Sequence, residues 1–157
     1  MRIIGIDPGL TKTGIGIIDA KNNSLNYVFS DTIYSSPSEK MADRLKHFHN
    51  KLLDIIKIYS PQEASIEETF VNKNPISSLK LGHARGALIL TLGICNIKVS
   101  EYSATSVKKT IVGTGRAEKH QIQAMVKFIL PNAKFDTEDE ADALAIAICH
   151  LNHQKKW

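Results

Sequence analysis

The sequence has little of what would mark several classes of protein. Only two of its 157 residues are cysteines, Cys95 and Cys149, and they form no CxxC motif. Both lie in apolar helical patterns, so we expect buried, reduced thiols rather than disulfides. None of the six histidines belongs to a cluster with zinc spacing. These absences argue against a disulfide-rich secreted domain and against a zinc module.

Long hydrophobic runs, repeats and low-complexity segments are also missing. No apolar run approaches the roughly 20 residues that a bilayer-spanning helix needs. The N-terminus enters a strand pattern directly, which does not fit a secretory signal peptide. With 43% hydrophobic residues the chain can build a real core. We therefore expect a single domain over residues 1–157, in the cytoplasm and outside the membrane.

Two common nucleotide-binding motifs are absent. The segment GTGRAEK at 113–119 lacks a second glycine before its lysine and a Ser or Thr after it, so it is not a P-loop. The glycines at 5, 9, 14 and 16 do not have the spacing of a dinucleotide fingerprint. The net charge of +4 and the pI near 9.0 favour a polyanionic partner, although many basic domains bind no nucleic acid.

The most informative stretch is the N-terminal MRIIGIDPGLTKTGIG at 1–16. Its isoleucine-rich run stops at Asp7, and Pro8-Gly9 then forces a turn. Such a run is typical of a central strand that is buried on both faces. A carboxylate at the tip of that strand is costly unless it is exposed, paired or bound to a metal. The hypothesis is that Asp7 is a metal ligand and that other acids converge on it.

The remaining patterns alternate between strands and helices. Strands at 12–20 and 25–34 flank a hairpin turn and form an antiparallel meander with the first strand. Apolar residues at intervals of three and four then predict a helix over about 41–59, whose other face, including Arg44, we expect to be solvated. The further expected elements are a strand at 62–68, a helix at 76–94, a strand at 97–102, a short helix capped by Ser103 or Thr105, a helix at 117–130 and a helix at 137–151 capped by Thr137. This order predicts an α/β fold with a five-stranded mixed β-sheet and helices on both faces.

The expected helix at 76–94 is rich in small residues, among them Gly82, Ala84 and Gly86. Small side chains allow close helix approach, whether inside the domain or between subunits.

Acidic residues form the candidate catalytic set. Asp7 and Glu67 each end an apolar strand, and the two strands are expected neighbours. On the last helix Asp142 shares a face with Asp139, three residues away, and with Glu138, four residues away. Clustered carboxylates raise one another's pKa, and bound Mg²⁺ removes that penalty. Two such ions can activate a water and stabilise the leaving oxygen of a phosphodiester.

The alternative is that the helical acids only interact with the helix dipole and that Glu67 is solvated. We favour that alternative for Glu138 and Glu140 taken singly, and the metal site for Asp7, Glu67 and Asp142 taken together.

Basic and aromatic residues suggest a nucleic-acid surface. The segment 98–127 carries mainly basic charges around a glycine-broken loop, which suits phosphate backbones although a solvated face is the usual explanation. Phe70 lies in a polar loop just after Glu67, where an exposed ring could stack on an unpaired base. The alternative, that Phe70 folds back into the core, stays open.

Four segments resemble a known family. GIDPGLTKTGIGII at 5–18, SIEETFVNKNPISSLKLGHARG at 65–86, EYSATSVKKTIVGTGRAEKHQI at 101–122 and EADALAIAICH at 140–150 are similar to motifs of RuvC-type Holliday junction resolvases (crossover junction endodeoxyribonucleases), in the RNase H-like superfamily. The resemblance covers nearly the whole chain. The first segment is weakly specific by itself, and the other three together are highly specific.

The resemblance implies a set of site residues. The metal-binding catalytic acids would be Asp7, Glu67, Asp139 and Asp142, with Lys119 as a catalytic cation. The family varies at the position of Asp139, and Glu138 and Glu140 flank that position here. The DNA-binding residues would be Phe70, Lys108, Lys109, Arg116 and Lys119. The contributions of His83 and His120 stay open.

The implied activity is Mg²⁺-dependent cleavage of four-way DNA junctions, with two metal ions per active site and Mn²⁺ as a substitute. A homodimer would nick two strands of like polarity symmetrically, in recombination and DNA repair, together with the RuvA and RuvB branch-migration complex. Three rival interpretations are another RNase H-like nuclease acting on structured RNA such as ribosomal RNA precursors, an actin-like ATPase or sugar kinase, and a non-catalytic junction-binding module.

Overall fold

The structure is a computed structural model that describes residues 1–21, 24–69 and 74–154. In these ranges the chain forms five strands and five helices in the expected order. The strands are β1 (Arg2–Asp7), β2 (Lys12–Lys21), β3 (Ser24–Tyr34), β4 (Glu63–Glu67) and β5 (Lys98–Tyr102). The helices are α1 (Met41–Tyr59), α2 (Pro75–Ile94), α3 (Ala104–Val112), α4 (Lys119–Ile129) and α5 (Glu138–Gln154). Ser103 caps α3, as one of the two expected candidates.

The strands form one mixed sheet in the order β3-β2-β1-β4-β5. β1, β2 and β3 are an antiparallel meander, and β4 and β5 join it in parallel with β1. Because β1 and β4 are parallel and Ile6 pairs with Ile66, both strands end at the same edge of the sheet. Asp7 and Glu67 therefore end adjacent strands, as the sequence predicts.

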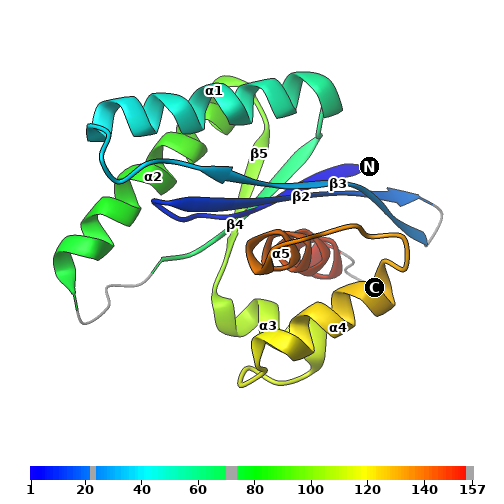
Figure 1. Cartoon of the computed structure of the whole chain (residues 1–157). Coiled ribbons are helices and arrows are strands. Elements are labelled where there is room, and N and C mark those ends of the chain that lie inside the picture. The colour runs from blue at the N-terminus through cyan, green and yellow to red at the C-terminus, as the bar shows by residue number, and fades with distance from the viewer. Residues whose placement is uncertain (22–23, 70–73, 155–157) are drawn as a thin grey trace.

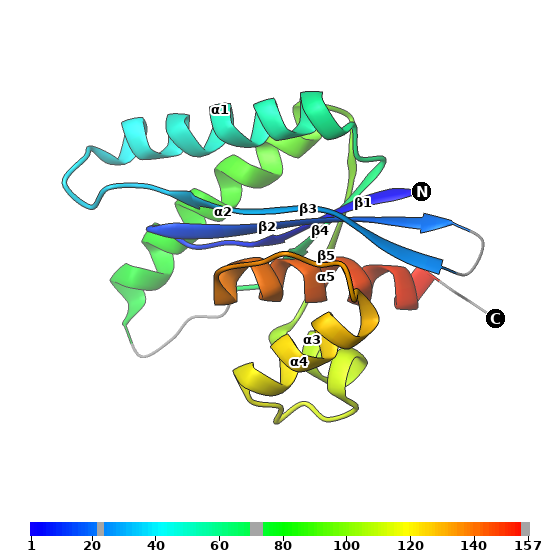
Figure 2. The same cartoon turned by 45° about the vertical axis from the view of Figure 1, so that its right-hand side comes forward.

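Helices cover both faces of the sheet, which confirms the expected layering. Figures 1 and 2 show α1 and α2 on one face and α5 on the other, with α3 and α4 beyond α5. Side chains alternate along β1, so Ile4 and Ile6 pack toward α1 and α2 while Ile3 packs toward α5. We call these the α1/α2 face and the α5 face. None of the helices in the described ranges is long and apolar enough to span a membrane.

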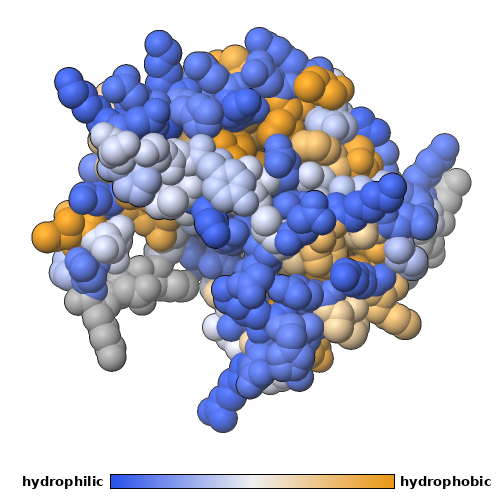
Figure 3. All heavy atoms as spheres, viewed as in Figure 1, coloured by the Kyte–Doolittle hydropathy of each residue, from blue (hydrophilic) through white to orange (hydrophobic). Residues whose placement is uncertain are grey.

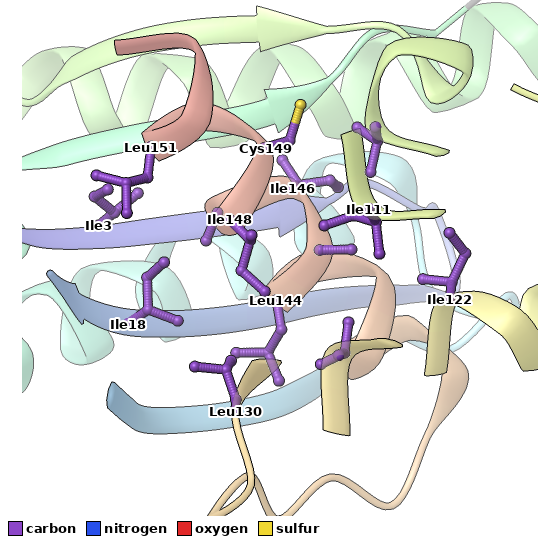
Figure 4. Close-up of a cluster of buried hydrophobic side chains, with 14 of the residues drawn as sticks. Ile3, Ile18, Ile111, Ile122, Leu130, Leu144, Ile146, Ile148, Cys149 and Leu151 are labelled. Atoms are coloured by element: carbon purple, nitrogen blue, oxygen red, sulfur yellow. The ribbon is translucent and has the colours of Figure 1, made fainter. Parts of the chain in front are cut away.

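α5 is the central helix of the second face. Figure 4 shows its apolar side chains between the sheet and the helices α3 and α4. Leu144, Ile146 and Ile148 are buried, as expected, but the burial extends almost all the way round the helix. A helix that is apolar on most of its circumference lies in a core rather than on a surface.

Glycines on β1 and β2 let the backbone of α5 approach the sheet closely. A Cβ atom on any of these glycines would collide with the helix backbone. It would lie 2.0 Å from the Ala143 oxygen for Gly5, 2.0 Å from the Asp139 oxygen for Gly14, and 2.6 Å from the Leu144 nitrogen for Gly16. The absence of side chains at these positions therefore determines where the N-terminal half of α5 lies.

Two polar residues are less exposed than the sequence pattern indicates. Arg44 was expected on the solvated face of α1, and this expectation is wrong because its guanidinium is buried. It donates to the Leu10 carbonyl oxygen at 2.7 Å and to Ser35 Oγ at 3.0 Å, which fastens the turn after β1 to α1. The long arginine side chain makes this possible from a position that periodicity assigns to solvent.

Glu140, in the first turn of α5, is also buried. Its carboxylate accepts hydrogen bonds from Ser30 at 2.8 Å and from Thr137 at 3.1 Å. Thr137 Oγ1 accepts from the Glu140 backbone N–H at 3.2 Å, so the expected N-cap is confirmed. Glu140 therefore stabilises the start of α5.

Candidate active site

The acids that end β1 and β4 point to the α5 face of the sheet. The alternation along β1 places Asp7 on the same side as Ile3, and that along β4 places Glu67 with Ser65, whose hydroxyl donates to the α5 carbonyl of Ile146 at 3.2 Å. The N-terminal turn of α5 lies over this edge because Gly14, the β2 partner of Asp7, is packed against the backbone of Asp139. Three elements thus bring acids to one place.

These residues surround a small cavity of about 200 Å³. Asp7, Glu67 and Asp142 line it together with Lys108 and Lys119. Its apolar wall comes from Ala104, Val107 and Ile122, on α3 and α4. Asp139 is half-buried beside this cavity and does not line it, although its charge acts on both Asp7 and Asp142. Three of the four sequence-predicted acids and two of the predicted lysines therefore line one cavity, and Asp139 is not among its lining residues.

The carboxylates at this site destabilise one another's ionised form. Burial, followed by the charges of Glu67, Asp142 and Asp139, raises the pKa of Asp7 to about 8. Burial and the charge of Asp142 raise the pKa of Glu67 to about 6. Burial also raises the pKa of Asp142 to about 6, although Lys119 opposes that rise. A cluster of this kind binds protons near neutral pH unless cations compensate it.

The donor set fits a hard divalent cation. All of the candidate ligands are carboxylate oxygens, which Mg²⁺ and Mn²⁺ prefer. A bound cation would stabilise the ionised forms that burial and mutual repulsion disfavour in Asp7, Glu67 and Asp142. Within residues 1–21, 24–69 and 74–154, no group of three or more His, Cys, Asp or Glu side chains is arranged so that it could hold a metal ion. Ligation by Asp7, Glu67, Asp139 and Asp142 thus remains a prediction.

The predicted basic residues separate into two groups. Lys108 is half-buried in the cavity wall, and Lys119 lies at the mouth with its ammonium 2.6 Å from Glu138 Oε2. The hydrogen bond from Lys119 to Glu138 raises the pKa of the lysine. Lys109 and Arg116 are exposed and do not line the cavity. Phe70 lies outside the described residues.

Three residues that contact the backbone near the acids were not singled out from the sequence. Arg85, on α2, donates from Nε to the carbonyl oxygen of Glu67 at 3.0 Å. Thr13 is fully buried, and its hydroxyl donates to the Gly9 carbonyl oxygen at 2.9 Å in the turn after Asp7. Gly14 admits the backbone of Asp139. Their positions in helix and strand patterns carry no sign of these contacts.

Comparison with known proteins identifies the family. Residues 3–150 match the family model described as crossover junction endodeoxyribonuclease RuvC. A relative of that name from Paramagnetospirillum magneticum is 51% identical over 154 residues, which are 98% of this chain and 93% of the relative. Another from Xanthobacter autotrophicus is 49% identical over 98% of this chain and 91% of its own length.

Solved structures give the same result for the fold. RuvC from T. thermophilus in complex with a Holliday junction substrate superimposes with a TM-score of 0.92 at 29% identity, over 99% of this chain and 95% of that one. The yeast mitochondrial Holliday junction resolvase Ydc2 has a TM-score of 0.66 at 13% identity and shares the fold, over 97% of this chain and 79% of its own. The expected RNase H-like fold is confirmed. The chain belongs to the RuvC family of crossover junction endodeoxyribonucleases.

Proposed function

We propose that this protein resolves four-way (Holliday) DNA junctions by symmetric, paired hydrolysis of phosphodiester bonds, in recombination and DNA repair. The observation that carries the proposal is the cavity where Asp7, Glu67 and Asp142 from three elements meet Lys108 and Lys119. The names of the relatives and the junction-bound RuvC from T. thermophilus supply the substrate class. We infer that the whole chain acts as one nuclease domain in the cytoplasm.

Asp7, Glu67, Asp139 and Asp142 would hold divalent cations at this site, with Mg²⁺ as the physiological ion, two per site, and Mn²⁺ as a substitute. When bound, the cations supply activation of the attacking water and neutralisation of the leaving oxygen. The raised pKa values of Asp7, Glu67 and Asp142 support this assignment, because the site concentrates negative charge that the described lysines offset only in part.

Lys119 and Lys108 line the cavity and would bind the scissile phosphate there. The ion pair between Lys119 and Glu138 is exposed, with 69% and 54% of the two side chains accessible, so it adds little stability. An incoming phosphate can therefore displace Glu138 and bind the ammonium group of Lys119 in its place. The apolar wall of Ala104, Val107 and Ile122 limits water around the phosphate and strengthens that interaction.

Replacing Lys119 or Lys108 with alanine should weaken junction binding and slow cleavage. Each loss removes one phosphate contact, so the slope of log affinity against log salt should fall by about one. We expect turnover to fall about tenfold to a hundredfold, because the charge of the phosphate is then less well compensated.

The measurement is junction affinity at several salt concentrations, together with single-turnover cleavage. Lys57→Ala is the matched control, since Lys57 is exposed on α1, across the sheet from the cavity. An unchanged slope combined with unchanged turnover in Lys119→Ala and Lys108→Ala would remove both lysines from the DNA-binding site.

We propose that two copies of the chain act together, because a four-way junction has two-fold symmetry and needs two cuts. α2 offers the surface for this pairing. Its exposed side carries Ile76, Leu79, Leu90 and Ile94, each 61–67% accessible, around Gly82 and Gly86, where a Cβ would meet no neighbour within 4 Å. Figure 3 shows orange apolar atoms over α2 at the left edge of the molecule.

A charged side chain on this exposed apolar side of α2 should dissociate the two copies of the chain. We expect Leu79→Glu to convert a dimer into a monomer and to suppress paired cutting, because burying an unpaired carboxylate in an apolar interface is costly. Sedimentation velocity measures the outcome. Ile58→Glu on α1 is the matched control, an equally exposed isoleucine at 72% on another helix. A dimer that persists in Leu79→Glu would place the interface elsewhere.

The RuvA and RuvB branch-migration complex is the proposed partner assembly, on the basis of family membership. The substrate assignment itself is tested by comparing cleavage of a four-way junction, a linear duplex and a structured RNA of equal length. Preference for the junction supports resolution. Preference for the RNA would instead support an RNase H-like nuclease that processes structured RNA.

A further inference from the structure

Arg85 joins α2 to the ends of two strands at the active-site edge. Its Nε donates to the carbonyl oxygen of Glu67 at 3.0 Å, and its Nη2 pairs with the carboxylate of Glu101 on β5. The Arg85 side chain is only 17% accessible, whereas that of Glu101 is 50% accessible. The Arg85 side chain is therefore mostly buried, and its hydrogen bond to Glu67 is partly shielded from solvent.

The Glu67–Glu68 peptide unit is held from both sides. Its oxygen accepts from Arg85, and its N–H, which belongs to Glu68, donates to the Tyr102 carbonyl oxygen at 2.9 Å. A peptide plane with both polar groups bonded cannot rotate freely, and its orientation sets the backbone at Glu67. That backbone in turn directs the Glu67 side chain into the cavity.

These two hydrogen bonds matter because of where the Glu67–Glu68 peptide unit lies in the chain. Glu67 is the last residue of β4, and the chain then runs through residues 68–74 before it returns as α2. In the described residues, the pairing of β4 with β1 ends at Ile66, whereas the pairing with β5 extends to Glu67 and Tyr102. A neighbouring strand therefore supports the backbone of Glu67 on one side and not on two. Arg85 supplies a hydrogen bond there from a different element.

We propose that Arg85 is a positioning residue for Glu67 and sets this carboxylate in the orientation that binds the divalent cation. The inference rests on the proposed function, since it gives Glu67 the role of a metal ligand. Arg85 itself does not line the cavity and acts through the peptide that follows Glu67. Groups that orient a ligand commonly affect metal affinity about tenfold to a hundredfold.

Arginine suits this role for geometric reasons. The planar guanidinium offers Nε–H and Nη–H donors along different directions, and here they serve a backbone carbonyl and a carboxylate at once. A lysine carries a single ammonium on a flexible stem. Arg85→Lys keeps the charge and loses the two-directional contact, so it should behave more like Arg85→Ala than like the wild type.

The competing explanation is that Arg85 only ties α2 to β5 through its ion pair with Glu101. Glu101→Gln separates the two. It removes the ion pair while Arg85 can still donate to the carbonyl of Glu67. If the Glu67 contact is the important one, Glu101→Gln should resemble the wild type in metal binding, even if it unfolds at a slightly lower temperature.

The experiment measures Mn²⁺ binding to the DNA-free protein from the electron paramagnetic resonance signal of free Mn²⁺. We expect Arg85→Ala and Arg85→Lys to weaken Mn²⁺ binding by about tenfold or more, and Glu101→Gln to stay within about twofold of the wild type. Junction binding in EDTA should change by less than about twofold in every variant, since no phosphate contact is lost. Hydrogen exchange at the Glu68 amide should accelerate in both Arg85 variants. This measurement tests directly whether Arg85 restrains the Glu67–Glu68 peptide unit in the folded protein.

Unchanged Mn²⁺ binding in the Arg85 variants would overturn the inference, and so would an equal loss in Glu101→Gln. Failure of the proposed function has a different signature. Wild-type protein that binds Mn²⁺ and cuts no junctions would contradict junction resolution, while weaker Mn²⁺ binding in Arg85→Ala would still support the role of Arg85. A wild-type protein that binds no Mn²⁺ would overturn both.

Discussion

Replacing Asp7 with asparagine should abolish junction cleavage while it stabilises the metal-free protein. Asp7 has the highest pKa of the three cavity acids, because burial and then the charges of Glu67, Asp142 and Asp139 raise it to about 8. Asparagine has nearly the same shape and carries no charge. We expect cleavage to fall about a thousandfold or more, since the central ligand is lost.

The gain in stability has a definite pH dependence. A carboxylate whose folded-state pKa is raised binds more protons when folded, so stability declines as pH rises from the unfolded value of 3.8 toward 8. The Asp7→Asn protein has no carboxylate at this position, so its stability lacks that part of the decline with pH. At pH 8 its free energy of unfolding should exceed that of the wild type by about 2–4 kcal/mol, and at pH 4 the difference should be small.

Chemical denaturation in EDTA at pH 4, 6 and 8, together with a cleavage assay in Mg²⁺, measures both effects. Asp19→Asn is the matched control, because the hydrogen bond from Arg2 lowers the pKa of Asp19 and that replacement should not stabilise the protein. Cleavage by Asp7→Asn near the wild-type rate would refute the site. Equal stability of the two proteins at pH 8 would refute the raised pKa of Asp7.

Replacing Gly14 with alanine should separate the two halves of the active site. A Cβ at this position would lie 2.0 Å from the Asp139 carbonyl oxygen, and the obstacle is backbone rather than a flexible side chain. The first turn of α5 must therefore move away from β2. Asp139 and Asp142 move with it, whereas Asp7 and Glu67 stay on their strands.

We expect Gly14→Ala to lose about 3 kcal/mol of stability and to cut junctions about a hundredfold more slowly, since a displacement near 1 Å is enough for such a loss. Thermal unfolding and single-turnover cleavage at a temperature where the variant is folded measure the two effects. Gly93→Ala, on α2 with no atom within 4 Å of its Cβ, is the matched control and should unfold no more easily than the wild type. Normal cleavage by folded Gly14→Ala would show that the placement of α5 does not depend on this contact.

Much of the site could be predicted because acids follow apolar strands. The isoleucines before Asp7 and the apolar residues before Glu67 identify two buried strands, and their parallel pairing brings both strand ends to one edge. Helical spacing predicts that the two remaining acids lie together, because Asp139 and Asp142 are three residues apart on α5. These are local patterns, and a single sequence contains them in full.

Contacts between distant elements could not be predicted in the same way. Arg44 and Arg85 occupy ordinary positions in helical patterns. Arg44 nevertheless reaches the Leu10 carbonyl in the turn after β1, and Arg85 reaches the Glu67 carbonyl at the end of β4. The role of Gly14 depends on how closely α5 approaches the sheet, which no spacing along the chain encodes. Periodicity indicates which side of a helix faces the core, but it does not indicate which groups a long polar side chain contacts.

The ends of the nicked strands on a synthetic four-way junction test the central claim most directly. With Mg²⁺ the wild-type protein should nick two strands of like polarity at symmetric positions across the crossover, and with EDTA it should bind the junction without nicking it. Nicking that persists in EDTA, or cuts that fall without symmetry on any strand, would contradict a metal-dependent junction resolvase built on Asp7, Glu67, Asp139 and Asp142.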